Sequence, residues 1–220
     1  SSSSNEFSSL IVQGTSSGNI TYNRYVNSLS NGSGWDLIGS PVNGLQISSF
    51  VSTNTSGGSP LATGNGSGAG ASGEYAIGIY DSSNNTWSNY TSANVGSDSF
   101  TPAKGYQMAA KGSASGSGVG AEMTFSGKPN TGTKNISIIN SETGNGEDNN
   151  AADGSRFNLV GNPYPSFFSV SSFLSANSSV LGTGFDVYGW NGSSYTTYNS
   201  ASGAYIAPGQ GFMVGADSSS

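Results

Sequence analysis

The sequence has no cysteine and no histidine among its 220 residues. Without cysteine the chain cannot form disulfides, use a thiol nucleophile or build a zinc–thiolate site. Histidine is the commonest general base and metal ligand, so its absence excludes Ser-His-Asp and Cys-His catalysis within this chain. We therefore expect a protein that is not an enzyme and that binds no cofactor.

Charge and long apolar runs are also scarce. Only 8% of the residues are charged, the formal net charge is −6, and the 6 basic residues are spread widely along the sequence. No basic patch is present to neutralise phosphates, so nucleic acid is not an expected partner. No apolar run approaches the roughly 20 residues needed to cross a bilayer, so we expect no membrane insertion.

What the sequence has in abundance is small polar residues together with aromatic ones. Its 34 glycines alone would suit a disordered linker, but 10 Phe, 11 Tyr and 3 Trp are far too many for one. The aromatic residues cluster with Val, Ile and Leu, which predicts a hydrophobic core. We expect an all-β protein with many polar turns.

Four sequence blocks recur in the same order in the two halves of the chain. Proline and aromatic positions match in register, which low complexity alone does not produce. The length changes fall in Gly/Ser-rich segments, so the pattern predicts two homologous units rather than a solenoid array. The matching blocks are residues 35–42 with 157–164, 47–51 with 170–174, 77–90 with 185–198, and 100–110 with 206–216.

Within each unit the pattern favours strands. Apolar side chains return at every second residue in Ile77-Gly78-Ile79-Tyr80, and turn signals such as "SSNNT" and "WNGSS" separate such runs. Residues 169–181 are the one stretch that we interpret as a short helix. The sum predicts two tandem antiparallel β-sandwiches of jelly-roll or immunoglobulin-like type.

The predicted organisation has four parts, and each unit is expected to open with an extra strand, at residues 19–26 and 121–127. The parts are an N-terminal extension (1–18), a first β-sandwich repeat (19–112), a Gly/Ser linker (113–118) and a second β-sandwich repeat (119–217).

The motifs "GWDLIGSPV", "FNLVGNPYPS", "YGWNGSSYTTYN" and "YIAPGQGFMV" resemble a repeated β-module of secreted, cell-surface proteins of Bacteroidetes-type bacteria. Such modules usually precede a C-terminal sorting domain used by type IX secretion. The resemblance covers about residues 19–216, and no recognisable sorting domain follows residue 216. It implies a protein that is secreted or held at the bacterial cell surface, and it implies no particular activity.

Aromatic side chains at or near the predicted hairpin tips are candidates for stacking on sugar rings. Four of them form equivalent pairs in the two units, and this equivalence favours shared core positions over ligand contacts. In an ungapped alignment Trp190 falls opposite Ser82, so Trp190 is the favoured surface contact. The candidates are Trp87, Tyr90, Trp190, Tyr195 and Tyr198.

The N-terminal segment "FSSLIVQG", residues 7–14, lies outside both repeats and is apolar. Phe7, Leu10, Ile11 and Val12 make it a candidate donor strand that completes the sheet of a neighbouring copy. The alternative is that this segment pairs with the first repeat of its own chain.

Acidic residues concentrate in "NGEDNNAADG", residues 145–154. Glu147, Asp148 and Asp153 offer the oxygen ligands that calcium prefers, but their spacing does not match an EF-hand loop. A solvated loop is the favoured interpretation, and no metal is expected.

These observations favour a non-enzymatic, extracellular structural or adhesive protein. Its tandem β units and low charge suit a subunit that self-associates into a filament or surface layer through strand edges. The alternative is a carbohydrate-binding module of a larger secreted protein, with surface glycans as partners. Nine N-x-S/T sequons allow glycosylation, but a chain this rich in Asn, Ser and Thr carries several by chance.

Overall fold

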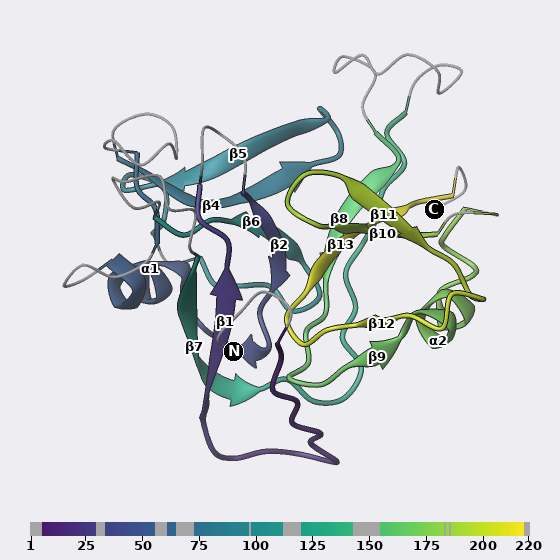
Figure 1. Cartoon of the computed structure of the whole chain (residues 1–220), viewed down its shortest axis with the longest axis horizontal. Coiled ribbons are helices and arrows are strands. Elements are labelled where there is room, and N and C mark those ends of the chain that lie inside the picture. The colour runs from purple at the N-terminus through teal and green to yellow at the C-terminus, as the bar shows by residue number, and fades with distance from the viewer. Residues whose placement is uncertain are drawn as a thin grey trace.

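The fold is mostly β, with several antiparallel sheets and two short helices, which confirms the β-rich expectation (Figure 1). The first half of the fold comprises the elements up to β7, and the second half comprises β8 and those after it. The computed structural model describes residues 6–29, 34–55, 61–64, 73–96, 98–111, 120–142, 155–182, 184 and 186–217.

A four-stranded antiparallel sheet forms the centre of the first half. Its strand order is β2-β6-β4-β5. The buried face carries Ile38 and Tyr106, and the β4–β5 hairpin turns through Asn85, which has a positive φ of 49°. Asn tolerates this left-handed conformation better than most residues. The strands are β2 (Asp36–Gly39), β4 (Glu74–Asp81), β5 (Thr86–Thr91) and β6 (Gly105–Met108).

The second half repeats this sheet with the same order of corresponding strands, β8-β13-β10-β11. The register also repeats. Leu37 lies opposite Gln107 in the first sheet, and Leu159 lies opposite Met213 in the second. Adding 122 to the first residue and 106 to the second converts one pair into the other, as the sequence blocks predict. The strands are β8 (Phe157–Gly161), β10 (Val187–Trp190), β11 (Tyr195–Tyr198) and β13 (Gly211–Gly215).

Each half also has one helix, α1 (Ile47–Thr55) and α2 (Val170–Ala176), at opposite ends of the molecule in Figure 1. The predicted helix at 169–181 is confirmed in a shorter form. Ser169 caps it, because its hydroxyl accepts a hydrogen bond from the Ser172 N–H. Helix α1 was not predicted, although its sequence matches that of α2.

Short extended segments precede the helices in both halves. In the second half β9 (Phe168–Ser169) pairs with β12 (Tyr205–Ile206), and in the first half Gln46 and Ser99 form the corresponding single bridge.

A three-stranded sheet of order β1-β7-β3 covers the core of the first half. It consists of β1 (Ile20–Val26), β7 (Ala121–Pro129) and β3 (Val42–Asn43), and both pairs are antiparallel. This differs from the expectation that β7 opens the second repeat. The inward side chains of β7 are apolar at alternate positions, so the strand is stabilised where it covers a core, irrespective of its place in the chain.

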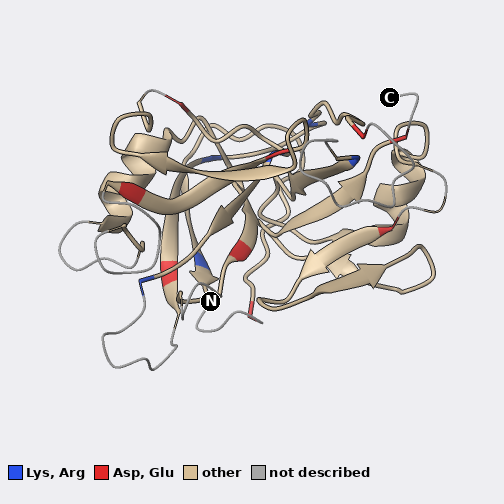
Figure 2. Ribbon diagram, turned by 90° about the horizontal axis from the view of Figure 1, so that it is seen from above, with Lys and Arg blue, Asp and Glu red and all other residues tan. Residues whose placement is uncertain are grey.

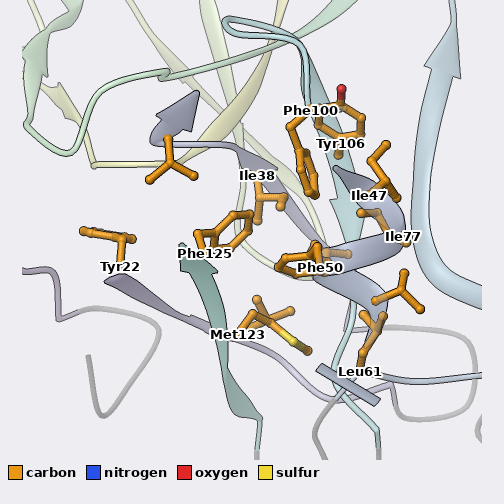
Figure 3. Packing of buried hydrophobic residues seen from close by; sticks show 14 of the residues in the cluster. Tyr22, Ile38, Ile47, Phe50, Leu61, Ile77, Phe100, Tyr106, Met123 and Phe125 are labelled. Carbon is orange, nitrogen blue, oxygen red and sulfur yellow. The ribbon is translucent and has the colours of Figure 1, made fainter. Parts of the chain in front are cut away.

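The largest core lies between this cover, α1 and the first four-stranded sheet. Figure 3 shows the rings of Phe50, Phe100 and Phe125 close together at its centre. Their centroids lie 4.7 to 5.6 Å apart, which is the range of favourable aromatic pairs. Strand β7 supplies Phe125 and Met123, so this core is completed by a strand from beyond the predicted linker. A separate core in the second half includes Val160, Val187 and Phe212.

The two halves meet through a near two-fold arrangement of backbone. The Gly39 N–H donates to the Gly209 carbonyl at 2.9 Å, and the Gly161 N–H donates to the Ala103 carbonyl at 2.9 Å. Gly39 corresponds to Gly161 and Ala103 to Gly209, so the two bonds are equivalent. Side chains of Leu37, Leu159 and Met213, here called the junction cluster, pack beside this contact.

Ala103 and Gly209 share a left-handed backbone, with φ of 66° and 63°. A Cβ is strained in this conformation and glycine is not. We expect Ala103→Gly to raise the free energy of unfolding by about 0.5–1 kcal/mol, and Gly209→Ala to lower it by about 1–2 kcal/mol. Urea denaturation followed by circular dichroism measures both. Destabilisation by Ala103→Gly would show that packing of the alanine methyl group stabilises the protein more than the left-handed backbone strain destabilises it.

Candidate functional site

Two aromatic pairs lie on the hairpins of the two halves. In the first hairpin Tyr80 on β4 pairs with Trp87 on β5, and the centroids of their rings lie 5.0 Å apart. In the second hairpin Trp190 on β10 pairs with Tyr195 on β11, and the centroids of their rings lie 4.9 Å apart. These four residues are called the aromatic patch below.

The two hairpins differ in length, which changes the residue equivalences. Six residues separate Tyr80 from Trp87, and four separate Trp190 from Tyr195. Trp190 therefore corresponds to Tyr80 and not to Ser82, as the ungapped alignment implied. The loss of two residues at the tip leaves the flanking register intact, because two is the side-chain period of a strand.

Trp190 is less available than expected. Its indole N–H donates to the Trp35 carbonyl at 2.8 Å, and its ring packs against the junction cluster. The residues of the patch that face solvent are instead Trp87 and Tyr195, which are 40% and 46% exposed. Tyr80 of the first hairpin and Trp190 of the second pack against the same junction cluster, so the two hairpins lie close together. Burial raises the pKa of Tyr195, and Tyr80 adds to the rise.

The other two aromatic candidates belong to the cores. Tyr90 packs against the core of the first half, and Tyr198 packs against that of the second. Burial raises the pKa of Tyr90 to about 12. Equivalent positions in both halves are thus occupied by partly buried tyrosines.

The N-terminal segment lies against both halves of its own chain. The Leu10 N–H donates to the Pro165 carbonyl at 2.6 Å. The ring of Phe7 meets Phe167 edge to face at 6.1 Å, and the Arg24 guanidinium lies 4.6 Å from the centre of the same ring.

This segment nevertheless leaves apolar surface in solvent. Leu10 is 45% exposed, Ile11 is 74% exposed, and Val12 is half-buried. Residues 6–18 form no strand, and the described residues include no ladder that contains them. The donor role of Phe7, Leu10, Ile11 and Val12 stays a prediction.

A buried ionisable pair lies beneath the N-terminal segment. Arg24 and Asp36 are 7% and 8% exposed, and Asp36 accepts hydrogen bonds from the backbone N–H (2.6 Å) and the side-chain amide (2.9 Å) of Asn27. Burial lowers the pKa of Arg24 and raises the pKa of Asp36, although the Asn27 bonds and the Arg24 charge oppose the second shift. The position corresponding to Asp36 in the second half is Asn158.

The raised pKa of Asp36 predicts a pH-dependent stability. The folded protein holds this proton more tightly than the unfolded chain, so the free energy of unfolding falls as pH rises from about 4 through the folded pKa. Asp36→Asn should remove that fall, which is about 1.4 kcal/mol for each unit by which the pKa is raised. Urea titrations at pH 4, 5.5 and 7 measure it.

Asp81→Asn is the matched control, because hydrogen bonds from Asn84 and Ser83 lower the pKa of the partly exposed Asp81 and give its contribution the opposite sign. Equal pH profiles for wild type and Asp36→Asn would show that this carboxyl does not titrate abnormally.

A groove of about 800 Å³ lies in the second half. It lies between α2, the buried face of β8 and β13, and residues 132–138. Sequence reasoning missed it, although the match of "ISSFVSTN" with "VSSFLSAN" marks the helix that lines it. Its lining includes Ile136, Phe168, Phe173, Asn177, Phe212 and Val214.

The described residues hold no group of three or more acidic, His or Cys side chains that could bind a metal ion. Glu147, Asp148 and Asp153, the weak calcium candidates, lie outside the described residues. Charged residues are scattered along the ribbon in Figure 2. In the part of the chain that is described, no helix is long and apolar enough to cross a membrane.

Residues 5–202 match the model of a family described as a domain of unknown function (DUF8693). The chain belongs to this family. No curated protein and no solved structure matches it. The match to this domain of unknown function includes the N-terminal segment, the groove's helix α2 and both hairpins of the aromatic patch.

Proposed function

We propose that this protein is a non-enzymatic structural or adhesive subunit outside the cell, which self-associates into a filament or layer by strand complementation. The observation that carries the proposal is the N-terminal segment with its exposed Leu10 and Ile11. An apolar extended segment that belongs to no sheet is the kind of element that adds to the sheet of another copy.

Two features of the fold support this proposal. The identical strand order of the two four-stranded sheets supports two tandem homologous sandwich units. Strand β7 lies after the predicted linker yet completes the cover of the first half, so sheets in this fold are completed by strands from elsewhere in the chain. A strand from a second copy extends the same principle.

An extracellular, bacterial cell-surface location is part of the proposal. It is supported by the resemblance of "GNPYPS" and "IAPGQGF" to modules of secreted proteins. The low charge also weakens repulsion between copies, which favours dense packing.

Deleting residues 1–15 tests the proposal. We expect the full chain to assemble, and the truncated chain to stay monomeric with unchanged circular dichroism, by light scattering and electron microscopy. Deletion of residues 1–5 alone, which keeps Phe7 to Val12, is the control and should assemble normally. Assembly of the longer truncation would contradict the donor role, and a monomeric full chain would contradict the function itself.

The aromatic patch supports a second candidate, a carbohydrate-binding module. Exposed Trp87 and Tyr195 lie on adjacent hairpins and can present flat faces to a sugar ring. Affinity electrophoresis in polysaccharide gels should then retard wild type and not Trp87→Ala. Tyr205→Ala removes an equally aromatic side chain, 65% exposed, outside the patch and serves as control. Equal mobility of all three proteins in every gel would exclude this candidate.

A further inference from the structure

The groove of the second half lies where the cover of the first half has a strand. In the first half Asp36 binds Asn27, the residue that follows β1. In the second half Asn158, the counterpart of Asp36, accepts from the Ile139 N–H at 3.0 Å and donates to the Ile139 carbonyl at 2.8 Å. Residues 133–138 thus take the place of β1.

The other edge of the cover has a counterpart as well. Tyr164 and Pro165 correspond to β3, 122 residues after Val42 and Asn43. Between the two edges the first half has β7, whereas no described residue occupies that place in the second half. The groove is there, and both edges line it, through Ile136 on one side and Tyr164 on the other.

The two helices differ in the same way, because an asparagine of α1 binds β7 and its counterpart in α2 has no such strand to bind in the described part of the chain. The Asn54 side chain of α1 donates to the Phe50 carbonyl at 2.9 Å, and it also binds the backbone of β7. It accepts from the Thr124 N–H at 2.9 Å and donates to the Thr124 carbonyl at 3.2 Å. Asn177, its counterpart 123 residues later, donates to the Phe173 carbonyl at 2.8 Å. Among the described residues nothing donates to the Asn177 side-chain oxygen.

The side chains beneath β7 are more buried than their counterparts that line the groove. Phe50 is fully buried and Asn54 is 2% exposed beneath β7. Their counterparts Phe173 and Asn177 are only partly buried. Ile139, Phe167 and Val180, among the exposed large apolar side chains, lie in or beside the segments that line the groove.

We propose that this groove is an acceptor site for the middle strand of a cover sheet, supplied by residues 8–14 of a second copy of the chain. The inference rests on the proposed function and names the site that it requires. The strand runs antiparallel to residues 133–138, as β7 runs to β1.

The register follows from the sequence of β7. Leu10-Ile11-Val12-Gln13-Gly14 matches Met123-Thr124-Phe125-Ser126-Gly127 in its apolar-x-apolar-polar-Gly order. Leu10 and Val12 then point into the groove, and the Asn177 amide binds the backbone of Ile11. Glycine suits the fifth position, because a Cβ on Gly127 would crowd the Asn43 carbonyl oxygen of β3 at 3.1 Å.

A second copy fits better than the same chain. Residues 143–154 and the other segments outside the described part contain no pair of large apolar residues at alternate positions. In its own chain the N-terminal segment contacts Pro165, at the edge of the groove, and Phe167, neither of which lines the groove, and it leaves Leu10 exposed. Lys134 is the only charged residue in the groove lining, and Glu6 is the only one in residues 6–18.

Blocking the groove tests the site. Asn177 lines it and its counterpart Asn54 is buried beneath β7, so Asn177→Arg should reduce assembly of the full chain at least tenfold without changing its circular dichroism. Ser175 lies on the same helix but is exposed and outside the groove lining, so Ser175→Arg should assemble as wild type does. Normal assembly of Asn177→Arg would overturn the acceptor site.

Cysteine trapping tests the occupant, because the chain has no native thiol. The ring centroids of Phe125 and Phe50 lie 4.7 Å apart. Val12 takes the place of Phe125 and Phe173 is the counterpart of Phe50, so Val12 should lie against Phe173. A mixture of Val12→Cys and Phe173→Cys chains should give a mixed disulfide dimer on oxidation. Val12→Cys mixed with Phe50→Cys should not, since that position is already covered.

The outcomes separate the two proposals. If the full chain assembles, and the 1–15 deletion does not, but no mixed disulfide forms, strand donation stands and this site is wrong. A disulfide formed only within a double-cysteine monomer would show that the segment fills the groove of its own chain, and would overturn the second copy as occupant. A full chain that never assembles contradicts the proposed function, whatever the groove binds as a free peptide.

Discussion

Gly161→Ala is expected to destabilise the protein by about 3 kcal/mol or more, because it forces backbone against backbone. A Cβ built on Gly161 lies 2.6 Å from the Gly39 Cα and 3.0 Å from the Lys104 carbonyl oxygen. Neither atom can rotate away as the end of a side chain does. The alanine would separate the two halves and break the paired hydrogen bonds at the junction.

The mirror substitution should behave alike. A Cβ on Gly39 lies 2.9 Å from the Gly161 Cα, so Gly39→Ala is expected to cost a similar amount. A methyl group at Gly18 would have no atom within 4 Å, and Gly18→Ala should change stability by less than about 0.5 kcal/mol. Urea denaturation measures all three. Small effects at both junction glycines would mean that the halves do not pack closely in solution.

Phe50→Ala is expected to lower the free energy of unfolding by about 3–5 kcal/mol, as removal of a fully buried ring usually does. The ring lies against Phe100 and Phe125, which are themselves fully buried, so its removal leaves a cavity in the core. Phe173→Ala removes the corresponding ring beside the open groove. It should cost less than half as much, because solvent already reaches that ring.

The same two substitutions can be compared with the groove occupied by a peptide. Adding a peptide of residues 6–16 to the truncated chain should increase the cost of Phe173→Ala and leave that of Phe50→Ala unchanged. Equal costs for the two substitutions without peptide would show that the groove is closed in solution.

Much of the β architecture could be predicted from the sequence, because repeated blocks record the same local geometry twice. The match of residues 35–42 with 157–164 places β2 and β8 correctly. The equivalence of Tyr90 and Tyr198 likewise indicates core positions, and each packs against the core of its own half. Helix α1 escaped prediction because its apolar residues are too few for a helical period to stand out. The same "SSF" sequence was interpreted as helical only in the second copy.

Partner choice between distant segments could not be predicted. Alternation in "AEMTFSG" identifies a strand but not the sheet that it joins, because any apolar face of the right width will accept it. The place of Trp190 was missed for a related reason. A two-residue change at a hairpin tip alters which residues correspond without changing which side chains face inward. The groove is likewise visible only when the two halves are compared in space.

The position of β7 bears on how the chain acquires its structure during synthesis. A polypeptide that emerges from its N-terminus presents α1 and the first four-stranded sheet well before residue 129 leaves the ribosome. Until then the phenylalanine cluster has no lid, and its apolar surface is a target for chaperones and proteases. A fragment that ends at residue 112 should therefore be recovered as aggregate, whereas one that ends at residue 130 should be recovered in solution.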